Sequence, residues 1–246
     1  MNGVYMNILE SIVNKLKSGQ RVVVFTGAGV SAESGIPTFR DKLDGLWNRF
    51  SAEDLDCADG FKASPQLVWE WYAWRRKMIV DAKPNLAHHA IALMETLVPE
   101  FTLITQNVDG LHQRAGSTKV IELHGNIHRS RCFDEDIAID KWAETDEVPP
   151  PCPHCGGMLR PDVVWFGEGL SGDTYGKAKE AIRNCTMLFS IGTSSQIYPA
   201  AVFPYEAAHR GAMVVQINPN PTDLDQVTSF ILRGKAGECV NGCRLS

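Results

Sequence analysis

The chain has 246 residues, of which 44% are hydrophobic and 22% charged, so it can bury a sizeable core and is not disordered by composition. Its formal net charge of -5 argues against a partner held through nucleic-acid phosphates, which needs a basic surface. With 7 cysteines, an odd number, and no apolar run of the roughly 18 residues that span a membrane, we expect a reduced, cytoplasmic protein without a disulfide framework or a membrane partner.

The predicted elements alternate along the chain between helices and buried strands. An amphipathic helix comes first and ends near Gly19. Short apolar, β-branched runs follow, and most are continuously apolar, which is typical of strands buried on both faces of a sheet. Helical patterns separate several runs, for example over residues 64–82 and 172–185, so the sequence predicts an α/β fold with a doubly wound parallel sheet. We expect its strands at residues 21–27, 101–107, 120–126, 162–168, 186–195 and 212–219.

One segment interrupts this alternation. Residues 129–161 are rich in Cys, Pro, Asp and Glu and show little apolar periodicity, so we expect them to form a small inserted lobe. The predicted division of the chain is therefore a sheet domain made of residues 1–128 and 162–246, with the lobe at 129–161.

The first strand runs directly into a turn that is rich in Gly and Ser. Gly27 and Gly29 would let the backbone approach a pyrophosphate, and a helix starting near Ser31 would point its N–H groups at it. The alternative is an ordinary tight turn between a strand and a helix, because the G-x-G-x5-G spacing is not the usual dinucleotide-binding fingerprint.

Polar side chains also follow the next strands, and ligands of parallel sheets bind beyond the carboxyl ends of the strands. Gln106, Asn107 and Asp109 could hydrogen-bond a ribose or an amide, although Asn107 or Asp109 could instead cap the following helix. His124 follows the third strand, and its near-neutral pKa suits a general base, whereas a lone histidine is more often structural. Residues that could also be ordinary turn residues complete this edge, namely Gly192, Thr193, Ser194 and Asn218.

The motif "CPHC", which begins at Cys152, has the spacing of a metal knuckle, since two thiolates separated by two residues can bind zinc. Only Cys132 lies upstream as a third thiol, and Glu135 stands where its partner cysteine would be. The sequence therefore predicts one of two arrangements. Either Cys132, Cys152 and Cys155 bind zinc together with Glu135, Asp134 or a nearby histidine, or the lobe binds no metal.

The blocks "GAGVSAESGIPTFR", "TQNVDGLHQRAG", "ELHGN", "RPDVVWFGE", "GTSSQIYPAA" and "INPN" occur in this order along the chain. Together they resemble the sirtuins, the family of NAD-dependent protein deacylases, in order and at suitable spacing. The resemblance extends from Val22 to Gly237. It implies a Rossmann-like domain into which a small, usually zinc-bearing lobe is inserted.

The resemblance implies NAD as a co-substrate, bound along the carboxyl edge of the sheet. It assigns Asn107 and Asp109 to the nicotinamide pocket, folds the loop at residues 39–47 over the cofactor, and brings Ala236 to the adenine. With the turn residues described above, the predicted NAD site consists of Gly27, Ala28, Gly29, Ser31, Phe39, Arg40, Gln106, Asn107, Asp109, Gly192, Thr193, Ser194, Asn218 and Ala236.

The family chemistry consumes NAD rather than reducing it. By resemblance, the amide oxygen of an acyl-lysine attacks C1′ of the ribose, nicotinamide leaves, and His124 acts as general base on a ribose hydroxyl that attacks the imidate carbon. The products are free lysine, nicotinamide and an acyl-ADP-ribose. Val164, Phe166 and Gly167 belong to a segment, residues 164–168, that would pair with the backbone of a protein or peptide substrate by β-augmentation.

The helix expected at residues 64–82 contains "WEWYAWRR", which resembles a sirtuin subgroup with Tyr-x-x-Arg beside the acyl pocket. That subgroup prefers succinyl-, malonyl- or glutaryl-lysine. Arg75 would pair bidentately with the terminal carboxylate and Tyr72 would donate another hydrogen bond, so we expect a preference for negatively charged acyl groups. The alternatives are a plain deacetylase in which both side chains only pack, an ADP-ribosyltransferase, a hydride-transferring oxidoreductase, and a non-enzymatic binding module built on the cysteine knuckle.

Overall fold

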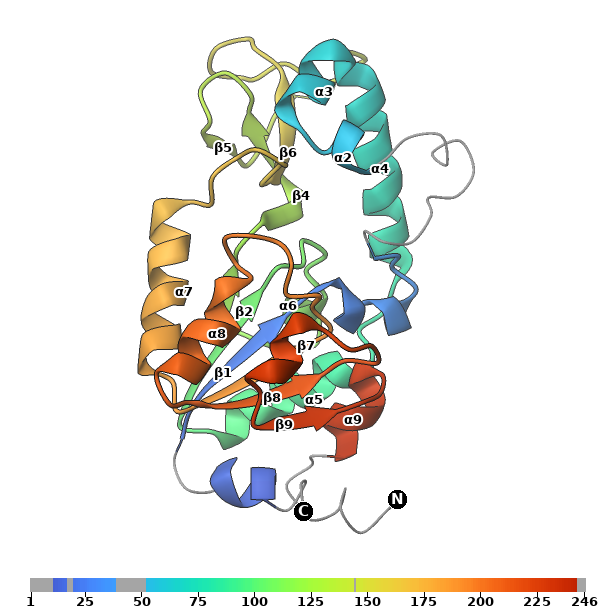
Figure 1. The fold of residues 1–246 in the computed structure, drawn as a ribbon. Helices are drawn as coiled ribbons and strands as arrows, with labels where there is room; N and C mark the ends of the chain where they lie inside the picture. The colour runs from blue at the N-terminus through green and yellow to red at the C-terminus, as the bar shows by residue number, and fades with distance from the viewer. Residues whose placement is uncertain (1–10, 17–19, 39–51, 144, 243–246) are drawn as a thin grey trace.

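The computed structural model describes residues 11–16, 20–38, 52–143 and 145–242. Within these residues it contains two sheets, a large one in the lower half of Figure 1 and a small one in the upper half. The strands of the large sheet are all parallel and lie in the order β3-β2-β1-β7-β8-β9. They are β1 (Arg21–Thr26), β2 (Glu100–Thr105), β3 (Val120–Glu122), β7 (Met187–Ile191), β8 (Met213–Ile217) and β9 (Phe230–Leu232).

Helices cover both faces of the large sheet (Figure 1). Along β1, Val22 and Val24 point into the core under α5 and α9, and Val23 and Phe25 point into the core under α7 and α8. This explains why the strands are continuously apolar, and the predicted doubly wound α/β fold is confirmed. The covering helices are α5 (Leu86–Leu97), α7 (Gly172–Asn184), α8 (Val202–His209) and α9 (Ala236–Gly242).

The small sheet is antiparallel, in the order β5-β4-β6. Three helices pack against it through a separate apolar core that includes Phe61, Trp71, Val163 and Trp165. The small lobe therefore contains a second stretch of chain, residues 52–81, besides the segment expected there, and the division at residues 129 and 161 stays a prediction. The elements of the lobe are α2 (Ala52–Leu55), α3 (Ala58–Ala63), α4 (Pro65–Asp81), β4 (Gly125–Cys132), β5 (Ala138–Ile139) and β6 (Leu159–Val163).

The two helices expected at 64–82 and 172–185 are confirmed as α4 and α7, and residues 11–16 of the expected first helix are helical. Pro65 occupies the start of α4, where its missing N–H costs no hydrogen bond. No helix in the described part of the chain is both long and apolar enough to cross a membrane. The remaining short helices are η1 (Ala28–Val30), η2 (Ala32–Ser34), α6 (Leu111–Arg114) and η4 (Asp223–Gln226).

The prediction of a strand of the parallel sheet at residues 162–168 was wrong. Residues up to Val163 belong to β6 of the small sheet, and the rest is irregular. Val163 and Trp165 are buried against α3 and α4. The apolar run therefore predicted burial correctly, but it did not indicate which sheet the segment joins. The short edge strand β9 was missed, because its apolar run is too brief to distinguish from a loop.

Candidate active site

The parallel strands of the large sheet end at one common edge, and the polar residues predicted for the site follow them there. The turn after β1 contains Gly27, Ala28 and Gly29; the turn after β2 contains Gln106, Asn107 and Asp109; the turn after β7 contains Gly192, Thr193 and Ser194; and His124 and Asn218 follow β3 and β8. Phe39 and Arg40 lie outside the described residues.

The turn after β1 packs directly on the turn after β7. The N–H of Gly29 donates to the carbonyl oxygen of Gly192 at 2.8 Å, and a Cβ atom at Gly29 would lie 2.7 Å from that oxygen. A Cβ at Gly27 would meet the same oxygen at 2.9 Å, so the close approach of the backbones requires glycine at both positions. The helix expected to start near Ser31 does not form. Two short 3-10 turns, η1 and η2, lie on either side of Ser31, and the second ends at Gly35 in a left-handed conformation with φ of 80°.

Ser31 connects the turn after β1 with the turn after β2. Its hydroxyl donates to Oδ2 of Asp109 at 2.7 Å and accepts from Nδ2 of Asn107 at 3.1 Å. Oδ1 of Asp109 also accepts from the N–H of Leu111, the first residue of α6, at 2.8 Å, although the N-cap of that helix is Gly110. Burial raises the pKa of Asp109, and the hydrogen bonds from Leu111 and Ser31 oppose that shift. A buried amide, hydroxyl and carboxylate at one point suit a ligand with a carboxamide group.

Thr193 connects the turns after β2, β7 and β8. Its hydroxyl accepts from Nε2 of Gln106 at 3.0 Å, and its carbonyl oxygen accepts from Nδ2 of Asn218 at 2.8 Å. Ser194 is half-buried beside it. Ser195, which sequence reasoning did not single out, is buried, and its hydroxyl has no hydrogen-bond partner among the described residues. That hydroxyl is a further candidate for contact with a polar ligand.

His124 lies between β3 and β4, where the chain passes from the large sheet to the small one. Its Nδ1 is 3.1 Å from the carbonyl oxygen of Gln106. Because a carbonyl oxygen only accepts, Nδ1 carries the proton and Nε2 keeps its lone pair. Burial lowers the pKa of His124, so the imidazole is neutral at neutral pH. The ring therefore has the protonation state of a general base that acts through Nε2.

The segment predicted to pair with substrate starts next to His124. The N–H of Val164 donates to the carbonyl oxygen of His124 at 3.0 Å, and the N–H of Phe166 donates to that of Asp56 at 2.8 Å. The side chain of Phe166 is exposed, and Gly167 has a left-handed φ of 86°. The segment therefore runs from the predicted base to the helical part of the small lobe.

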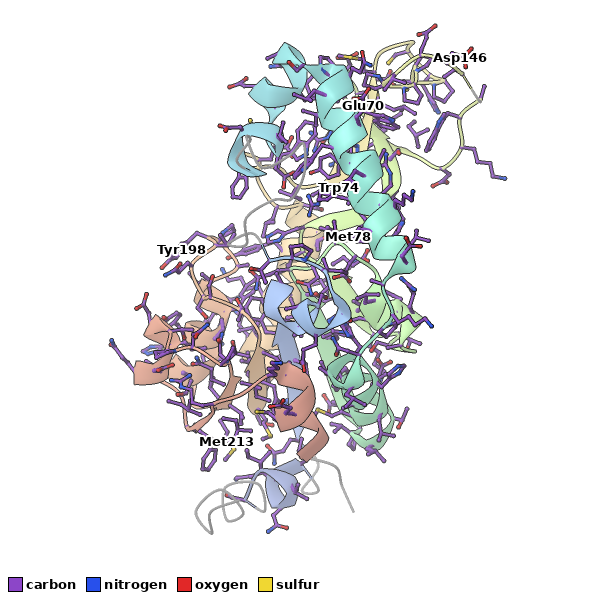
Figure 2. All side chains as sticks on the ribbon, turned by 90° about the vertical axis from the view of Figure 1, so that its right-hand side faces the viewer. Glu70, Trp74, Met78, Asp146, Tyr198 and Met213 are labelled. Carbon is purple, nitrogen blue, oxygen red and sulfur yellow. The ribbon has the colours of Figure 1, made fainter. Side chains whose placement is uncertain are left out.

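Tyr72 and Arg75 lie on the side of α4 that packs into the lobe. Figure 2 shows the helix from the side that carries Glu70, Trp74 and Met78. Tyr72 is fully buried, and the side chain of Arg75 is 16% exposed. The two predicted acyl-recognition residues are therefore neighbours in the interior, as their helical spacing indicates.

A buried carboxylate, which sequence reasoning missed, already contacts this pair. The hydroxyl of Tyr72 donates to Oδ1 of Asp56, and Nη1 of Arg75 lies 3.8 Å from Oδ2. Nε1 of Trp165 donates to the hydroxyl of Tyr72 at 2.9 Å. Burial raises the pKa of Tyr72 well above its ordinary value, so the phenol keeps its proton and acts as a donor.

Two buried histidines behind the strand-end cluster were also missed. The rings of His88 and His112 have centroids 4.8 Å apart. Nε2 of His88 lies 3.5 Å from the hydroxyl of Ser31, and Nε2 of His112 lies 3.0 Å from that of Thr26. Burial lowers the pKa of His88 to about 4 and that of His112 to about 3. Periodicity places both on buried helix faces but does not reveal their partners.

Four potential metal ligands meet in the small lobe. The sulfur atoms of Cys132, Cys152 and Cys155 and a carboxylate oxygen of Glu135 lie within 4.8 Å of one another, and the sulfurs of Cys132 and Cys155 are 3.4 Å apart. Ligands of a tetrahedral zinc ion are separated by about 3.3–3.8 Å. This donor set therefore fits zinc, and Glu135, not Asp134, lies within the group of four.

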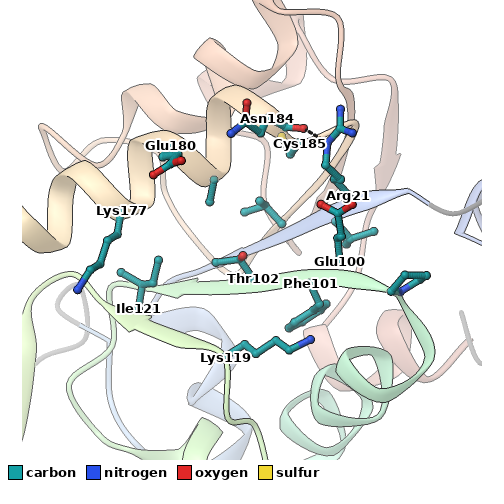
Figure 3. Close-up of a pocket in the computed structure, with 14 residues that line it drawn as sticks. Arg21, Glu100, Phe101, Thr102, Lys119, Ile121, Lys177, Glu180, Asn184 and Cys185 are labelled. Carbon is teal, nitrogen blue, oxygen red and sulfur yellow. Dashed lines mark hydrogen bonds between the residues drawn. The ribbon is translucent and has the colours of Figure 1, made fainter.

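A hollow of about 490 Å³ lies at the opposite edge of the large sheet, between the amino ends of the strands and α7 (Figure 3). At its rim, Nε of Arg21 donates to the carbonyl oxygen of Asn184 at 2.5 Å. None of the residues predicted for the site lines this hollow. Because open parallel sheets bind ligands beyond their carboxyl ends, we locate the functional site at the other edge.

Ala236, the predicted adenine contact, begins α9. The N–H of its neighbour Gly237 donates to Oε2 of Glu33 at 2.7 Å, so the start of α9 lies beside η2 and the turn after β1. This position is consistent with the far end of a long ligand that starts at the strand-end cluster.

This chain is similar to known proteins in both sequence and fold. The model of the Sir2 family matches residues 27–199. A protein of Aquifex aeolicus called NAD-dependent protein deacylase is 50% identical over 216 residues, which cover 87% of this chain and 90% of that protein. A crystal structure described as a Sir2 homologue in complex with NAD superposes with a TM-score of 0.88 at 43% identity, covering 95% of this chain and 91% of the other.

A more distant structure is described as a Sir2 variant with a deacetylated peptide and 3′-O-acetyl ADP-ribose. It superposes with a TM-score of 0.81 at 29% identity and covers 95% of this chain and 96% of the other. The match to the family model and the 50% identity, each over most of the chain, suffice to assign the family.

Proposed function

The chain belongs to the Sir2 family, and on this premise we propose that it removes acyl groups from lysine side chains of proteins and consumes NAD in doing so. The curated relative at 50% identity is named for this activity, and a structural relative at 43% identity binds NAD. A cytoplasmic setting is part of the proposal, because none of the six described cysteines forms a disulfide.

The position of His124 carries this proposal. The ring is held through Nδ1 by the turn after β2, and its backbone carbonyl holds Val164 at the start of the predicted peptide-binding segment. The proposed base therefore stands between the proposed NAD site and the proposed peptide site, which a reaction between the two substrates requires.

The strand-end residues fit NAD. The glycines of the turn after β1 let it pack closely on the turn after β7, while Ser31, Asn107 and Asp109 present polar groups to a carboxamide. When bound, NAD supplies an electrophilic ribose carbon whose leaving group is nicotinamide. The part of His124 is to accept a proton from a ribose hydroxyl at Nε2, and burial of the ring keeps that nitrogen unprotonated.

The finer proposal concerns the acyl group, for which we propose a preference for acyl chains that end in a carboxylate, such as succinyl, malonyl or glutaryl. Its support is the pair of Tyr72 and Arg75, a phenol donor beside a guanidinium in the interior of the lobe. Such a pair matches a carboxylate in charge and hydrogen bonding. A plain deacetylase is the second candidate, in which the pair is structural.

A product-resolved assay tests both levels. The purified protein is mixed with NAD and one peptide whose lysine is acetylated, succinylated, malonylated or glutarylated in turn, and nicotinamide and acyl-ADP-ribose are followed by mass. We expect one nicotinamide per acyl group removed, and a loss of about 100-fold or more in His124→Ala. His209→Ala, at an exposed histidine on α8, is the matched control.

The outcomes separate the alternatives. Removal of acidic acyl groups faster than acetyl, with the order reversed in Arg75→Met, supports the finer proposal. Faster removal of acetyl with no effect of Arg75→Met leaves a deacetylase. Transfer of ADP-ribose to the peptide without loss of its acyl group, or reduction of NAD, would refute the deacylase proposal itself.

A further inference from the structure

The Tyr72–Arg75 pair is not open in the structure, because it holds a carboxylate of the chain itself. Asp56, directly after α2, is 3% exposed and receives the hydroxyl of Tyr72 on one oxygen and the guanidinium of Arg75 near the other. Trp165 closes the enclosure by donating to Tyr72 at 2.9 Å, and the ring of Trp71 lies 4.7 Å from the guanidinium carbon. An acyl carboxylate would seek the same donors.

Asp56 also belongs to the wall of the proposed peptide site. Its carbonyl oxygen accepts from Phe166 N at 2.8 Å, and the next residue, Cys57, forms a parallel bridge with Phe166. The same segment is hydrogen-bonded through Val164 to the carbonyl oxygen of His124, so the backbone at Asp56 and the backbone at the proposed base are both bonded to residues 164–166. The carboxylate therefore lies where the acyl end of a bound lysine is proposed to reach.

We propose that Asp56 is a specificity-determining residue, whose carboxylate occupies the Tyr72–Arg75 pair in the free enzyme and must be displaced by the carboxylate of an acidic acyl group. This inference rests on the proposed deacylase function. It assigns to Asp56 a role that neither the sequence motif nor the family assignment contains.

The physical reason is competition for one set of donors. The phenol of Tyr72 has a single proton, which Asp56 already accepts, and two carboxylates beside the one guanidinium of Arg75 repel each other. Burial raises the pKa of Asp56 although Arg75 and Tyr72 oppose the shift, so even the single carboxylate is only partly compensated there. An acetyl group carries no charge and makes no such demand. Asp56 therefore reduces the advantage of acidic acyl groups over acetyl below what Tyr72 and Arg75 alone would give.

The nearest charged neighbours do not relieve this competition. Arg160, also buried, is engaged with Glu168 through two hydrogen bonds, at 2.5 and 2.8 Å. Glu168 in turn accepts from the N–H of Trp165 at 2.9 Å. Arg160, whose charge also lowers the pKa of Asp56, is thus already matched with a carboxylate, and the direct contacts of Asp56 are with Arg75 and Tyr72.

The test is Asp56→Asn, which keeps the size of the side chain and removes its charge. Values of kcat/KM are measured with succinyl-lysine, with its neutral amide isostere and with acetyl-lysine in one peptide. We expect the succinyl-to-acetyl ratio and the acid-to-amide ratio each to rise about tenfold or more, the worth of a charge-assisted hydrogen bond. Asp59→Asn, an exposed aspartate three residues on, should leave both ratios unchanged.

Unchanged or lower ratios in Asp56→Asn, with acetyl activity retained, would overturn the inference and make Asp56 a structural counter-ion of Arg75. Absence of NAD-dependent removal of any acyl group by the parent protein would instead overturn the proposed function. If the Asp56→Asn variant does not fold, the acid-to-amide ratio of the parent protein tests the inference instead. In a parent protein that removes succinyl groups, an acid-to-amide ratio below about tenfold supports competition by Asp56, and a higher ratio refutes it, since the pair would then be available to substrate.

Discussion

Replacement of Gly29 by alanine tests how tightly the turn after β1 packs on the turn after β7. The Cβ atom of an alanine would lie 2.7 Å from the carbonyl oxygen and 2.9 Å from Cα of Gly192, whereas ordinary van der Waals contact begins at 3.4 Å. Both atoms belong to backbone and cannot rotate away. The turns after β1 and β7 must therefore separate by about 0.7 Å to restore contact at 3.4 Å.

The magnitude follows from two losses. The hydrogen bond from Gly29 N to Gly192 O, now 2.8 Å, would lengthen beyond useful range and lose about 1 kcal/mol. Strain from the inserted methyl group adds about 1–3 kcal/mol. We therefore expect Gly29→Ala to lower the free energy of unfolding by about 2–4 kcal/mol.

Urea unfolding measures this difference. The matched control is Gly176→Ala in α7, where a Cβ meets nothing within 4 Å, and there we expect stabilisation of about 0.5–1 kcal/mol because alanine favours the helix. Isothermal titration then measures NAD binding, which should weaken in Gly29→Ala because the backbone cradle has moved. Stability of Gly29→Ala within about 0.5 kcal/mol of the parent would refute the packing argument. Lost stability with unchanged NAD affinity would refute the placement of the dinucleotide.

Three other predictions concern stability and metal. The pKa values of His88 and His112, about 4 and about 3, lie below the 6.5 of an unfolded histidine, so the unfolded chain binds protons that the folded chain does not. The two histidines therefore lower the free energy of unfolding only below about pH 6.5, by about 1.4 kcal/mol per pH unit for each histidine down to pH 4. Urea unfolding across this pH range measures the loss. A free energy of unfolding that does not change with pH would contradict their burial as neutral rings. Glu95→Gln should cost about 1–3 kcal/mol in thermal unfolding, because the buried carboxylate accepts hydrogen bonds from the backbone and hydroxyl of Thr118. Glu135→Ala should lower bound zinc, measured by elemental analysis and by the loss of stability on chelation, and Glu135→Cys should raise it; equal zinc content in all three proteins would exclude Glu135 as a ligand.

The sequence predicted the large sheet well because both of its faces are covered. Val23 and Phe25 are as buried as Val22 and Val24, so the strand reads as one apolar run. The same signal failed at Trp165, which is equally buried but packs on helices of the small lobe. Burial can be predicted from composition, whereas the partner in burial depends on tertiary packing.

The strand-end residues could be predicted because all parallel strands finish at one edge, whatever the details of the turns. The helix expected at Ser31 did not form, since the turn closes at Gly35 after two short 3-10 turns. Asp56 could not be predicted. In "AEDLDCADG" it is one acidic residue among several, and only the packing of α2 against α4 makes it the buried one.

The separate apolar core of the small lobe has an evolutionary consequence. The core around Trp71, Tyr72 and Trp165 shares no buried residue with the two cores on either face of the large sheet. Substitutions in the core around Trp71 and Tyr72 therefore leave the packing on both faces of the large sheet unchanged. Relatives of this chain can therefore vary the small lobe, where we propose that the acyl group is recognised, without altering the large sheet, where we propose that NAD binds.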